Sequence, residues 1–227
     1  MSVNIAIDGP AGAGKSTIAK MVAGKLNFIY VDTGAMYRAM GLYFHNLGIS
    51  PEDGDSICNA CKGADISIVY EAGVQQVFLN GENVTGLLRT EEAGKMASAI
   101  SGYAKVREKL VELQQKMAAL ENVVMDGRDI GTVVLPGADL KIYLTASVET
   151  RAKRRFLELT EKGIPCNIKE IEKDIEERDY HDMHRENSPL RRAEDAIYLD
   201  SSDMTIDEVA DAILDALSQK EGKSGQE

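Results

Sequence analysis

The strongest constraint on the fold of this 227-residue chain is a short glycine-rich segment near its start. The segment has the pattern G-x-x-x-x-G-K-S and consists of Gly9, Pro10, Ala11, Gly12, Ala13, Gly14, Lys15 and Ser16, with Thr17 next. The apolar run Val3–Ile7 precedes it, and Ile18, Val22 and Leu26 follow at helical spacing. A strand, a glycine-rich loop and a helix in this order are typical of a loop that binds the phosphates of a nucleoside triphosphate.

The chemistry of this loop follows from its residue types. Glycines allow successive backbone N–H groups to turn inward around an anion, and the positive end of the helix dipole points at the same place. We expect the Lys15 ammonium to reach the β- and γ-phosphates of the nucleotide and the Ser16 hydroxyl to bind Mg²⁺. Residues 9–17 are therefore predicted to bind a nucleoside triphosphate, with Lys15 as a catalytic residue. The loop alone does not identify the reaction.

Size, charge and hydropathy limit the class of protein. The length suits a single domain over residues 1–218, followed by a flexible polar tail over residues 219–227. A net charge of −11 argues against non-specific binding of nucleic acid, which needs a basic surface. No apolar run approaches the ~20 residues that a membrane helix requires, and no signal-peptide core precedes the first strand. We expect a cytoplasmic monomer that binds small molecules but neither nucleic acid nor membrane.

Strand-like and helix-like segments alternate along most of the chain. Apolar β-prone runs occur near residues 28–31, 123–125, 140–144 and 196–199, with helical patterns between them. The residues expected to begin helices are Thr33, Ser50 (before Pro51), Thr90, Ser147, Asn167 and Thr205. This alternation predicts an α/β fold with three layers and a central parallel sheet. In such a sheet the loops after the strands meet at the carboxyl edge, where ligands bind.

One stretch breaks the alternation. Residues 66–70, 74–79 and 82–85 read as three short strands, and Ala72-Gly73 and Asn80-Gly81 are turn signals between them. We predict a small antiparallel insert over about residues 63–102, in a core formed by residues 1–62 and 103–218. The basic helix that follows Ser147, broken at Gly163, suggests a lid over about residues 151–166.

Cys58 and Cys61 form a C-x-x-C pair, a pattern that also occurs in metal and redox sites. A structural zinc site would need four ligands at metal spacing, and the third cysteine, Cys166, is remote. The pair also lies in a helical pattern rather than after a strand. We therefore interpret these cysteines as small apolar residues that pack on a helix face.

The remaining polar residues suggest a reaction between two phosphates. Asp126 follows the apolar run Val123–Met125, the usual place of a carboxylate that helps to hold Mg²⁺ beside a phosphate loop. Arginines, which suit phosphate contacts, are frequent between Arg151 and Arg192, whereas no histidine lies in a recognisable catalytic motif. A phosphate acceptor is already mostly ionised at pH 7 and needs no general base, only cations that reduce its repulsion by the donor.

Several longer strings are more specific than the phosphate loop. They are the D-T-G-A-M-Y-R string at residues 32–38, L-R-T-E at 88–91, M-D-G-R-D-I-G-T-V-V at 125–134 and E-R-D at 177–179. Together with the loop they resemble the bacterial cytidylate kinases, in the same order as far as about residue 215. The insert also resembles the extension of the monophosphate-binding region in that family. The resemblance implies a P-loop kinase that transfers phosphate from ATP, with Mg²⁺, to CMP or dCMP.

The resemblance also implies roles for individual residues. The acceptor nucleotide would be held by Thr33, Tyr37, Arg38, Ser98, Arg107, Arg128, Asp129, Arg178, Asp182 and Arg185. Within this set Arg38 would contact the acceptor phosphate, and Ser98, Arg107 and Asp129 would line the cytosine. Arg128, Arg154 and Arg178 would join Lys15 as catalytic cations, and Ser16 and Asp126 would hold Mg²⁺, directly or through water.

Two other functions stay open on the sequence alone. Another small P-loop kinase, acting on adenylate or on a sugar acid, would share the loop and the lid. A nucleotide-binding module without catalysis would share the fold, although it need not keep Lys15, Ser16 and Asp126.

Overall fold

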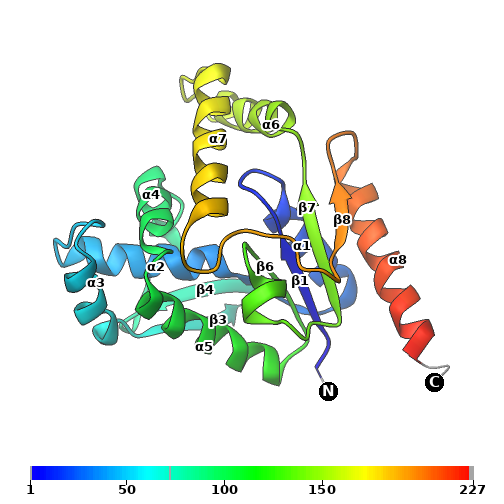
Figure 1. Ribbon diagram of the computed structural model, residues 1–227, viewed down its shortest axis with the longest axis horizontal. Helices are drawn as coiled ribbons and strands as arrows, with labels where there is room; N and C mark the ends of the chain where they lie inside the picture. The colour runs from blue at the N-terminus through cyan, green and yellow to red at the C-terminus, as the bar shows by residue number, and fades with distance from the viewer. Residues whose placement is uncertain (1, 72, 225–227) are drawn as a thin grey trace.

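The computed structural model describes residues 2–71 and 73–224. Its central sheet is formed by β1 (Asn4–Asp8), β2 (Ile29–Asp32), β6 (Val123–Gly127), β7 (Leu140–Thr145) and β8 (Ile197–Asp200). All strands run parallel in the order β2-β6-β1-β7-β8 (Figure 1). The predicted parallel sheet is therefore confirmed, with β2 and β8 at its edges.

The strands carry apolar residues on both faces because helices cover both faces. Ile5 and Ile7 of β1 pack in one core cluster with α1 (Lys15–Leu26) and α8 (Ile206–Ser224). Ala6, between them, points to a second cluster with α2 (Thr33–Asn46) and α5 (Ala104–Leu120). This alternation on a fully buried strand gives the predicted three layers.

The predicted antiparallel insert is also confirmed. It consists of β3 (Ile66–Glu71), β4 (Val74–Leu79) and β5 (Glu82–Asn83) in that order, followed by α4 (Glu91–Ile100). Val77 and Leu79 of β4 are buried in the same cluster as α2, so the small sheet shares the core of the domain. The predicted turn at Ala72-Gly73 includes Ala72, which lies outside the described residues.

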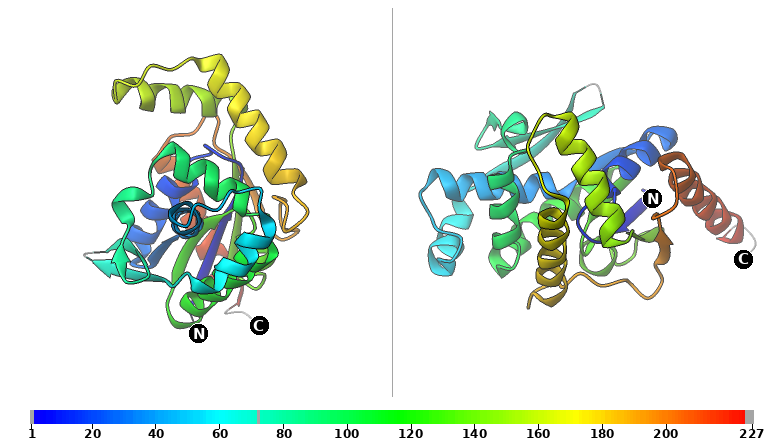
Figure 2. Two further views of the ribbon diagram at one scale, coloured as in Figure 1. Left: turned by 90° about the vertical axis from the view of Figure 1, so that its left-hand side faces the viewer. Right: turned by 90° about the horizontal axis from the view of Figure 1, so that it is seen from above.

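The helices α6 (Val148–Glu161) and α7 (Ile168–His184) stand above the carboxyl edge of the central sheet (Figures 1 and 2). They pack on each other around a small cluster of their own, formed by Ala152, Ile171 and Ile175. Figure 2 shows this helix pair projecting from the rest of the chain.

Several predicted element ends differ from the structure. Asp32, not Thr33, caps α2, because its carboxylate accepts a hydrogen bond from the Ala35 N–H while Thr33 already has helical backbone. Helix α3 (Gly54–Ala60) is capped by Asp53 rather than by Ser50. Both errors replace one good capping residue by another nearby. Helix α8 continues to Ser224, past the end predicted at residue 218, and residues 225–227 lie outside the described residues.

The other predicted caps are confirmed. Thr90, Ser147, Asn167 and Thr205 each accept a backbone hydrogen bond at the start of the helix that follows. Cys61 is buried in the core cluster of α2 and α5, as the packing interpretation of the C-x-x-C pair predicts. Among residues 2–71 and 73–224, no helix is both long and apolar enough to cross a membrane.

Candidate active site

A cavity of about 1290 Å³ lies at the carboxyl edge of the central sheet, below α6 and α7. Its walls come from the glycine-rich loop, from the segments after β2 and β6, and from α4, α5, α6 and α7. Parallel strands place their carboxyl ends at one edge, so segments far apart in sequence meet there. Residues 11–17 of the loop, the turn at residues 32–34 and the loop at residues 126–129 line this cavity, so these three segments meet at one edge of the sheet, as predicted.

The loop between β1 and α1 is shaped by its glycines. Gly9 has a φ of +149°, and a Cβ atom there would lie 1.9 Å from the Leu144 carbonyl oxygen, so no larger residue fits. Gly14 has a φ of +86° and turns the chain into α1. Gly9 and Pro10 are not among the residues that line the cavity, whereas the predicted loop residues from Ala11 to Thr17 are. Gly9 therefore has a packing role.

Lys15 is buried at the centre of this loop. Its ammonium donates a 2.7 Å hydrogen bond to the Pro10 carbonyl oxygen. Burial and the nearby Arg128 lower the pKa of Lys15, while Asp126 opposes the change. Nearby carboxylates do not fully balance the charge of this buried ammonium, so an anion that binds beside it is stabilised.

Asp126 is the centre of a group of oxygen atoms. One of its carboxylate oxygens accepts a hydrogen bond from Ser16 Oγ at 2.9 Å, and the other accepts one from Tyr30 at 2.8 Å. Burial raises the pKa of Asp126, with a smaller contribution from Asp32. Thr33 Oγ donates to the Asp126 carbonyl oxygen at 2.7 Å.

This oxygen group fits a magnesium ion that is shared with a nucleotide. Mg²⁺ prefers one or two carboxylates, hydroxyl groups and water, and completes its shell with substrate phosphates. In the part of the chain that the structure describes, no cluster of three or more His, Cys, Asp or Glu side chains could hold a metal ion by itself. Ser16 and Asp126 could hold such an ion together with phosphate oxygens of a bound nucleotide.

The turn after β2 carries a second cationic group. Arg38 of α2 pairs with Asp32 at 3.2 Å, and its Nε atom is buried with no hydrogen-bond partner among the described residues. Asp32 thus both caps α2 and holds the Arg38 guanidinium at the cavity wall. A buried donor without an acceptor costs free energy until a ligand supplies one.

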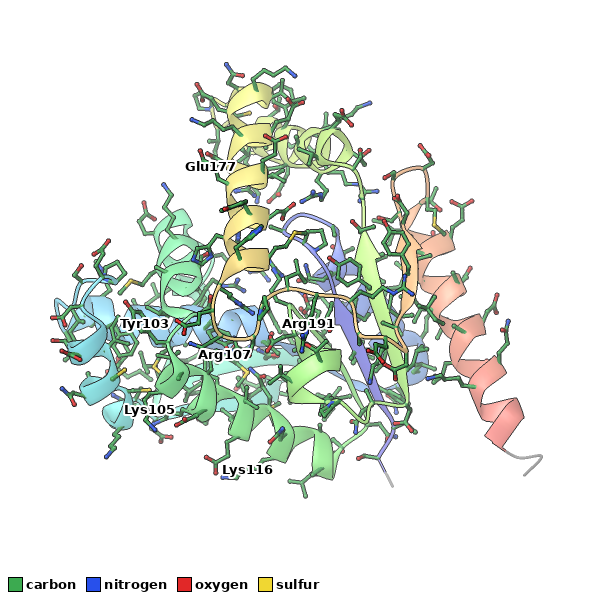
Figure 3. All side chains as sticks on the ribbon, viewed as in Figure 1. Tyr103, Lys105, Arg107, Lys116, Glu177 and Arg191 are labelled. Atoms are coloured by element: carbon green, nitrogen blue, oxygen red, sulfur yellow. The ribbon has the colours of Figure 1, made fainter. Side chains whose placement is uncertain are left out.

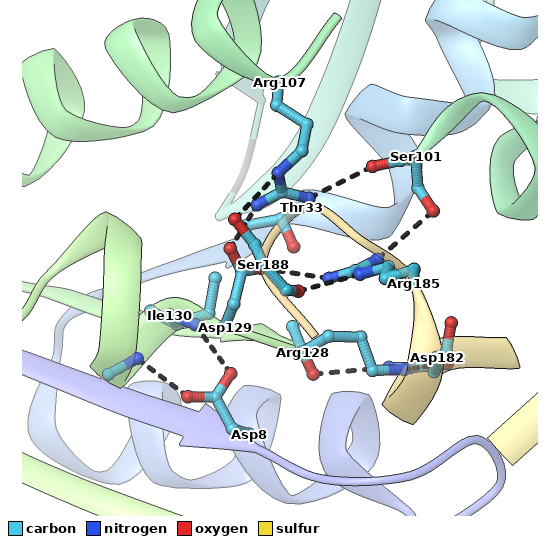
Figure 4. Close-up of polar contacts among 12 residues, drawn as sticks. Asp8, Thr33, Ser101, Arg107, Arg128, Asp129, Ile130, Asp182, Arg185 and Ser188 are labelled. Atoms are coloured by element: carbon cyan, nitrogen blue, oxygen red, sulfur yellow. Dashed lines mark hydrogen bonds and ion pairs between the residues drawn. The ribbon is translucent and has the colours of Figure 1, made fainter. Parts of the chain in front are cut away.

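Arg128, in the loop after β6, pairs with Asp182 of α7 at 2.7 Å (Figure 4). Asp182 is buried, and the Arg128 guanidinium holds the pKa of its carboxyl below the usual value despite that burial. Arg178, one turn before Asp182, is exposed and lines the cavity, and it makes no hydrogen bond or ion pair within residues 2–71 and 73–224.

A third polar group lies deeper, where α5 meets the end of α7. Arg107 projects into this interior, whereas Lys116 of the same helix lies at the outer edge (Figure 3). The Arg107 guanidinium forms a buried ion pair with Asp129, and Arg185 approaches the same carboxylate at 3.7 Å (Figure 4). Tyr37 lies beside Arg107, with the guanidinium carbon 5.9 Å from its ring centre, and burial raises the pKa of Tyr37 to about 12.

The structure thus brings nearly all predicted site residues to one cavity. Those that line it are Ser16, Thr33, Tyr37, Arg38, Ser98, Arg107, Asp126, Arg128, Asp129, Arg154, Arg178, Asp182 and Arg185. Arg154 is engaged elsewhere, because it donates to the Ser201 carbonyl oxygen at 2.6 Å.

Some residues at this site were not predicted. The buried Asp8 carboxylate ends β1 and accepts hydrogen bonds from the Ile130 and Gly131 N–H groups, both at 2.7 Å (Figure 4). Burial raises the pKa of Asp8 to about 6. Its only sequence signal is its position, as a carboxylate that ends an apolar strand directly before the glycine-rich loop.

The helices α6 and α7 are tied to the glycine-rich loop by a second unpredicted group. Arg151 of α6 and Asp179 of α7 form a buried pair at 2.7 Å. Arg151 donates to the Ala11 carbonyl oxygen at 2.8 Å, and the Ala11 N–H donates to Asp179 at 3.3 Å. The sequence shows only an arginine-rich helix, with no indication of which arginine faces the loop.

The arrangement defines a class of enzyme. A phosphate loop faces a cavity that is lined by several arginines, which is the arrangement of a P-loop kinase. A gluconokinase structure from Sinorhizobium meliloti 1021 has a similar fold, with a TM-score of 0.51, 13% identity, and coverage of 99% of this chain and 97% of that one.

Sequence relatives identify the family. A protein-family model described as cytidylate kinase matches residues 5–219. The cytidylate kinase of Lactobacillus johnsonii is 51% identical over 96% of this chain and 95% of its own length. For that of Caldicellulosiruptor saccharolyticus the identity is 53%, over 94% of both chains. For that of Bacillus subtilis it is 47%, over 96% of this chain and 97% of the relative. The chain belongs to the cytidylate kinase family.

Proposed function

We propose that this protein transfers the γ-phosphoryl group of ATP to CMP and to dCMP, giving ADP and CDP or dCDP. The observation that supports this proposal best is the pairing of two anion-binding groups across one cavity: the loop around Lys15 on one side, and Arg38 and Arg128 on the other. The bond from the γ-phosphorus to the β,γ-bridging oxygen breaks, and a bond to an oxygen of the CMP phosphate forms. The bridging electron pair leaves with ADP.

The acceptor half needs cations rather than a base. The second pKa of a phosphate monoester is near 6, so the attacking oxygen is already ionised at pH 7. The difficulty is to bring two anionic groups together, and fixed positive charges reduce that cost. Arg38 would hold the acceptor phosphate through its free Nε donor, and Arg128 and Arg178 would neutralise the group in transfer. Arg154 would join them on lid closure, after leaving Ser201.

The donor half would hold ATP on residues 9–17. Lys15 would exchange the Pro10 carbonyl oxygen for phosphate oxygens. Ser16 and Asp126 would hold Mg²⁺, which would neutralise phosphate charge when bound.

The deep pair of Arg107 and Asp129 would recognise the base. Cytosine presents its N4 amine as a donor next to the N3 acceptor, which matches a carboxylate beside a guanidinium. Uracil presents an acceptor at O4 and a donor at N3. The Asp129 carboxylate would then face another acceptor, and the Arg107 guanidinium would face another donor. Ser98 would line the same base, while Thr33 and Tyr37 would lie beside the nucleotide and Asp182 and Arg185 on its sugar and base side.

The experiment is a panel of acceptors with ATP and Mg²⁺, with ADP formation as the readout. We expect turnover with CMP and dCMP, and far less with UMP, AMP, GMP or a sugar acid. Efficient turnover of AMP or a sugar acid would favour another P-loop kinase. Binding of ATP without turnover of any acceptor would favour a non-catalytic module.

A further inference from the structure

The outer edge of β2 is completed by side chains rather than by another strand. β2 is the last strand of the central sheet, and among the described strands it pairs only with β6. Alternate residues of an edge strand direct their backbone N–H and C=O groups outward, where they need other partners. In β2 these outward residues are Tyr30 and Asp32. The antiparallel insert supplies partners for the N–H and C=O groups of Asp32 and for the C=O group of Tyr30.

Gln75 of β4 satisfies both backbone groups of Asp32. Its side-chain oxygen accepts from the Asp32 N–H at 2.8 Å, and its side-chain nitrogen donates to the Asp32 carbonyl oxygen at 3.3 Å. A primary amide is suited to this double contact because it carries a donor and an acceptor side by side. Tyr70 of β3 adds a hydrogen bond from its hydroxyl to the Tyr30 carbonyl oxygen at 3.0 Å.

The residue held in this way is the one that orients the acceptor arginine. The Asp32 carboxylate accepts from the Ala35 N–H at 2.9 Å and pairs with Arg38 at 3.2 Å. The backbone of Asp32 therefore sets the position of its carboxylate, and the carboxylate sets the position of the Arg38 guanidinium. A displacement of about 1 Å at such a group is enough to weaken a preorganised site.

We propose that Gln75 is a positioning residue for the monophosphate acceptor: it fixes Asp32 and, through it, Arg38. The insert then takes part in acceptor binding without touching the nucleotide. This inference rests on the proposed role of Arg38, and it gives a position in the insert a function that the family resemblance does not imply.

The neighbouring Gln76 offers a matched control. It has the same chemistry and lies on the same strand, and it is partly buried like Gln75. Its side chain faces the other side of β4, where its oxygen accepts from Asn83 at 3.1 Å. Replacing either glutamine with alanine removes the same atoms, so any general weakening of the insert affects both variants.

The test compares Gln75→Ala, Gln76→Ala and Tyr70→Phe by steady-state kinetics and by calorimetric binding of CMP and of ATP. For Gln75→Ala we expect the KM and Kd for CMP to rise about 5- to 30-fold, the effect of one or two lost hydrogen bonds. The kcat and the KM for ATP should stay within about twofold of the parent. Tyr70→Phe should show a smaller change in the same direction, and Gln76→Ala none.

A second experiment, which combines Gln75→Ala with Arg38→Ala, distinguishes failure of this inference from failure of the proposed function on which it rests. If Gln75 acts through Arg38, Gln75→Ala should add nothing to the loss of CMP binding caused by Arg38→Ala. Additive losses, or equal effects on CMP and ATP, would overturn the role of Gln75 and leave the proposed function standing. If Arg38→Ala itself leaves CMP binding unchanged, the proposed acceptor site is wrong. If Gln75→Ala fails to fold, Gln75→Glu is tested in its place. This variant keeps the side-chain acceptor but loses the donor, and we expect it too to raise the KM and Kd for CMP.

Discussion

Removal of the Asp129 carboxylate should affect both stability and the choice of base. Asp129 is buried between two arginines, paired with Arg107 and 3.7 Å from Arg185. Burial raises the pKa of Asp129, and the two guanidinium groups oppose that shift. Asp129→Ala leaves both arginines without their common counter-ion.

The size of the effect follows from the contacts that remain. An uncompensated charge in a buried pair costs about 3–5 kcal/mol. Arg107 keeps hydrogen bonds to Ser188 Oγ at 3.1 Å and to the Ser101 carbonyl oxygen at 3.3 Å, and Arg185 keeps its bond to the Ser188 carbonyl oxygen at 2.8 Å. We therefore expect Asp129→Ala to lower the free energy of unfolding by ~3 kcal/mol, the lower end of this range. For a chain of this size, that loss corresponds to a fall in Tm of about 6–12 °C.

The loss of base recognition is estimated separately. One polar contact to the cytosine amine accounts for ~1–3 kcal/mol. The ratio of kcat/KM for CMP to that for UMP should therefore fall about 5- to 150-fold. The assays are scanning calorimetry without nucleotide, and ADP formation with each acceptor well below the Tm of the variant.

Two further variants make the test specific. Arg107→Ala/Asp129→Ala removes both charges of the pair and should be more stable than Asp129→Ala alone. Lys105→Ala breaks an exposed pair with Glu108 on the same helix and should change neither the Tm nor the ratio. An undiminished preference for CMP would remove Asp129 from base recognition. An unchanged Tm would contradict the energetic reasoning about the buried pair.

Three other perturbations test other parts of the site. Lys15→Ala should abolish ADP formation with CMP while the fold, followed by circular dichroism, persists; retained turnover would refute the donor assignment. The pKa of Asp8 is about 6, above its ordinary value, so the native state binds this proton more tightly than the unfolded state does. Its contribution to the free energy of unfolding should fall by up to about 3 kcal/mol as the pH rises from about 4 to about 6. Denaturant titrations across that range should show a smaller fall for Asp8→Asn, and an identical pH dependence would contradict the assignment. Trypsin cleavage near Lys162, at the end of α6, should slow when ATP and CMP are added together; an equal rate would count against closure of the lid.

The sequence predicted the features that depend on local chemistry. The glycine-rich loop, the Asn80-Gly81 turn and the cap at Thr205 specify their own conformations through neighbouring residues, and all three are found. Where two capping residues lay close together, as with Asp32 and Thr33, the local pattern could not choose between them, because both side chains can accept the same backbone hydrogen bond.

The contacts that depend on the whole fold could not be predicted in this way. Arg107 and Asp129 are 22 residues apart on different elements, and only the packing of α5 against the loop after β6 brings them together. Their spacing carries no information about the pair, so both came from the family resemblance. Gln75 and Asp32 are 43 residues apart, and a glutamine in a short strand has no pattern that marks it.

The pairing of the cavity arginines explains how an acidic protein can hold two anionic substrates. Five arginines at the cavity already lie beside an aspartate: Arg38 pairs with Asp32, Arg128 with Asp182 and Arg151 with Asp179, and Arg107 and Arg185 share Asp129. Without these partners, several buried guanidinium groups would repel one another and destabilise the fold. In the proposed function, an incoming phosphate or base would replace or share an aspartate. The cations would then be held in position before the substrate arrives, and little reorganisation would be needed. The exposed Arg178 has no such partner among the described residues, and we expect its variants to change affinity for phosphate with the smallest change in stability.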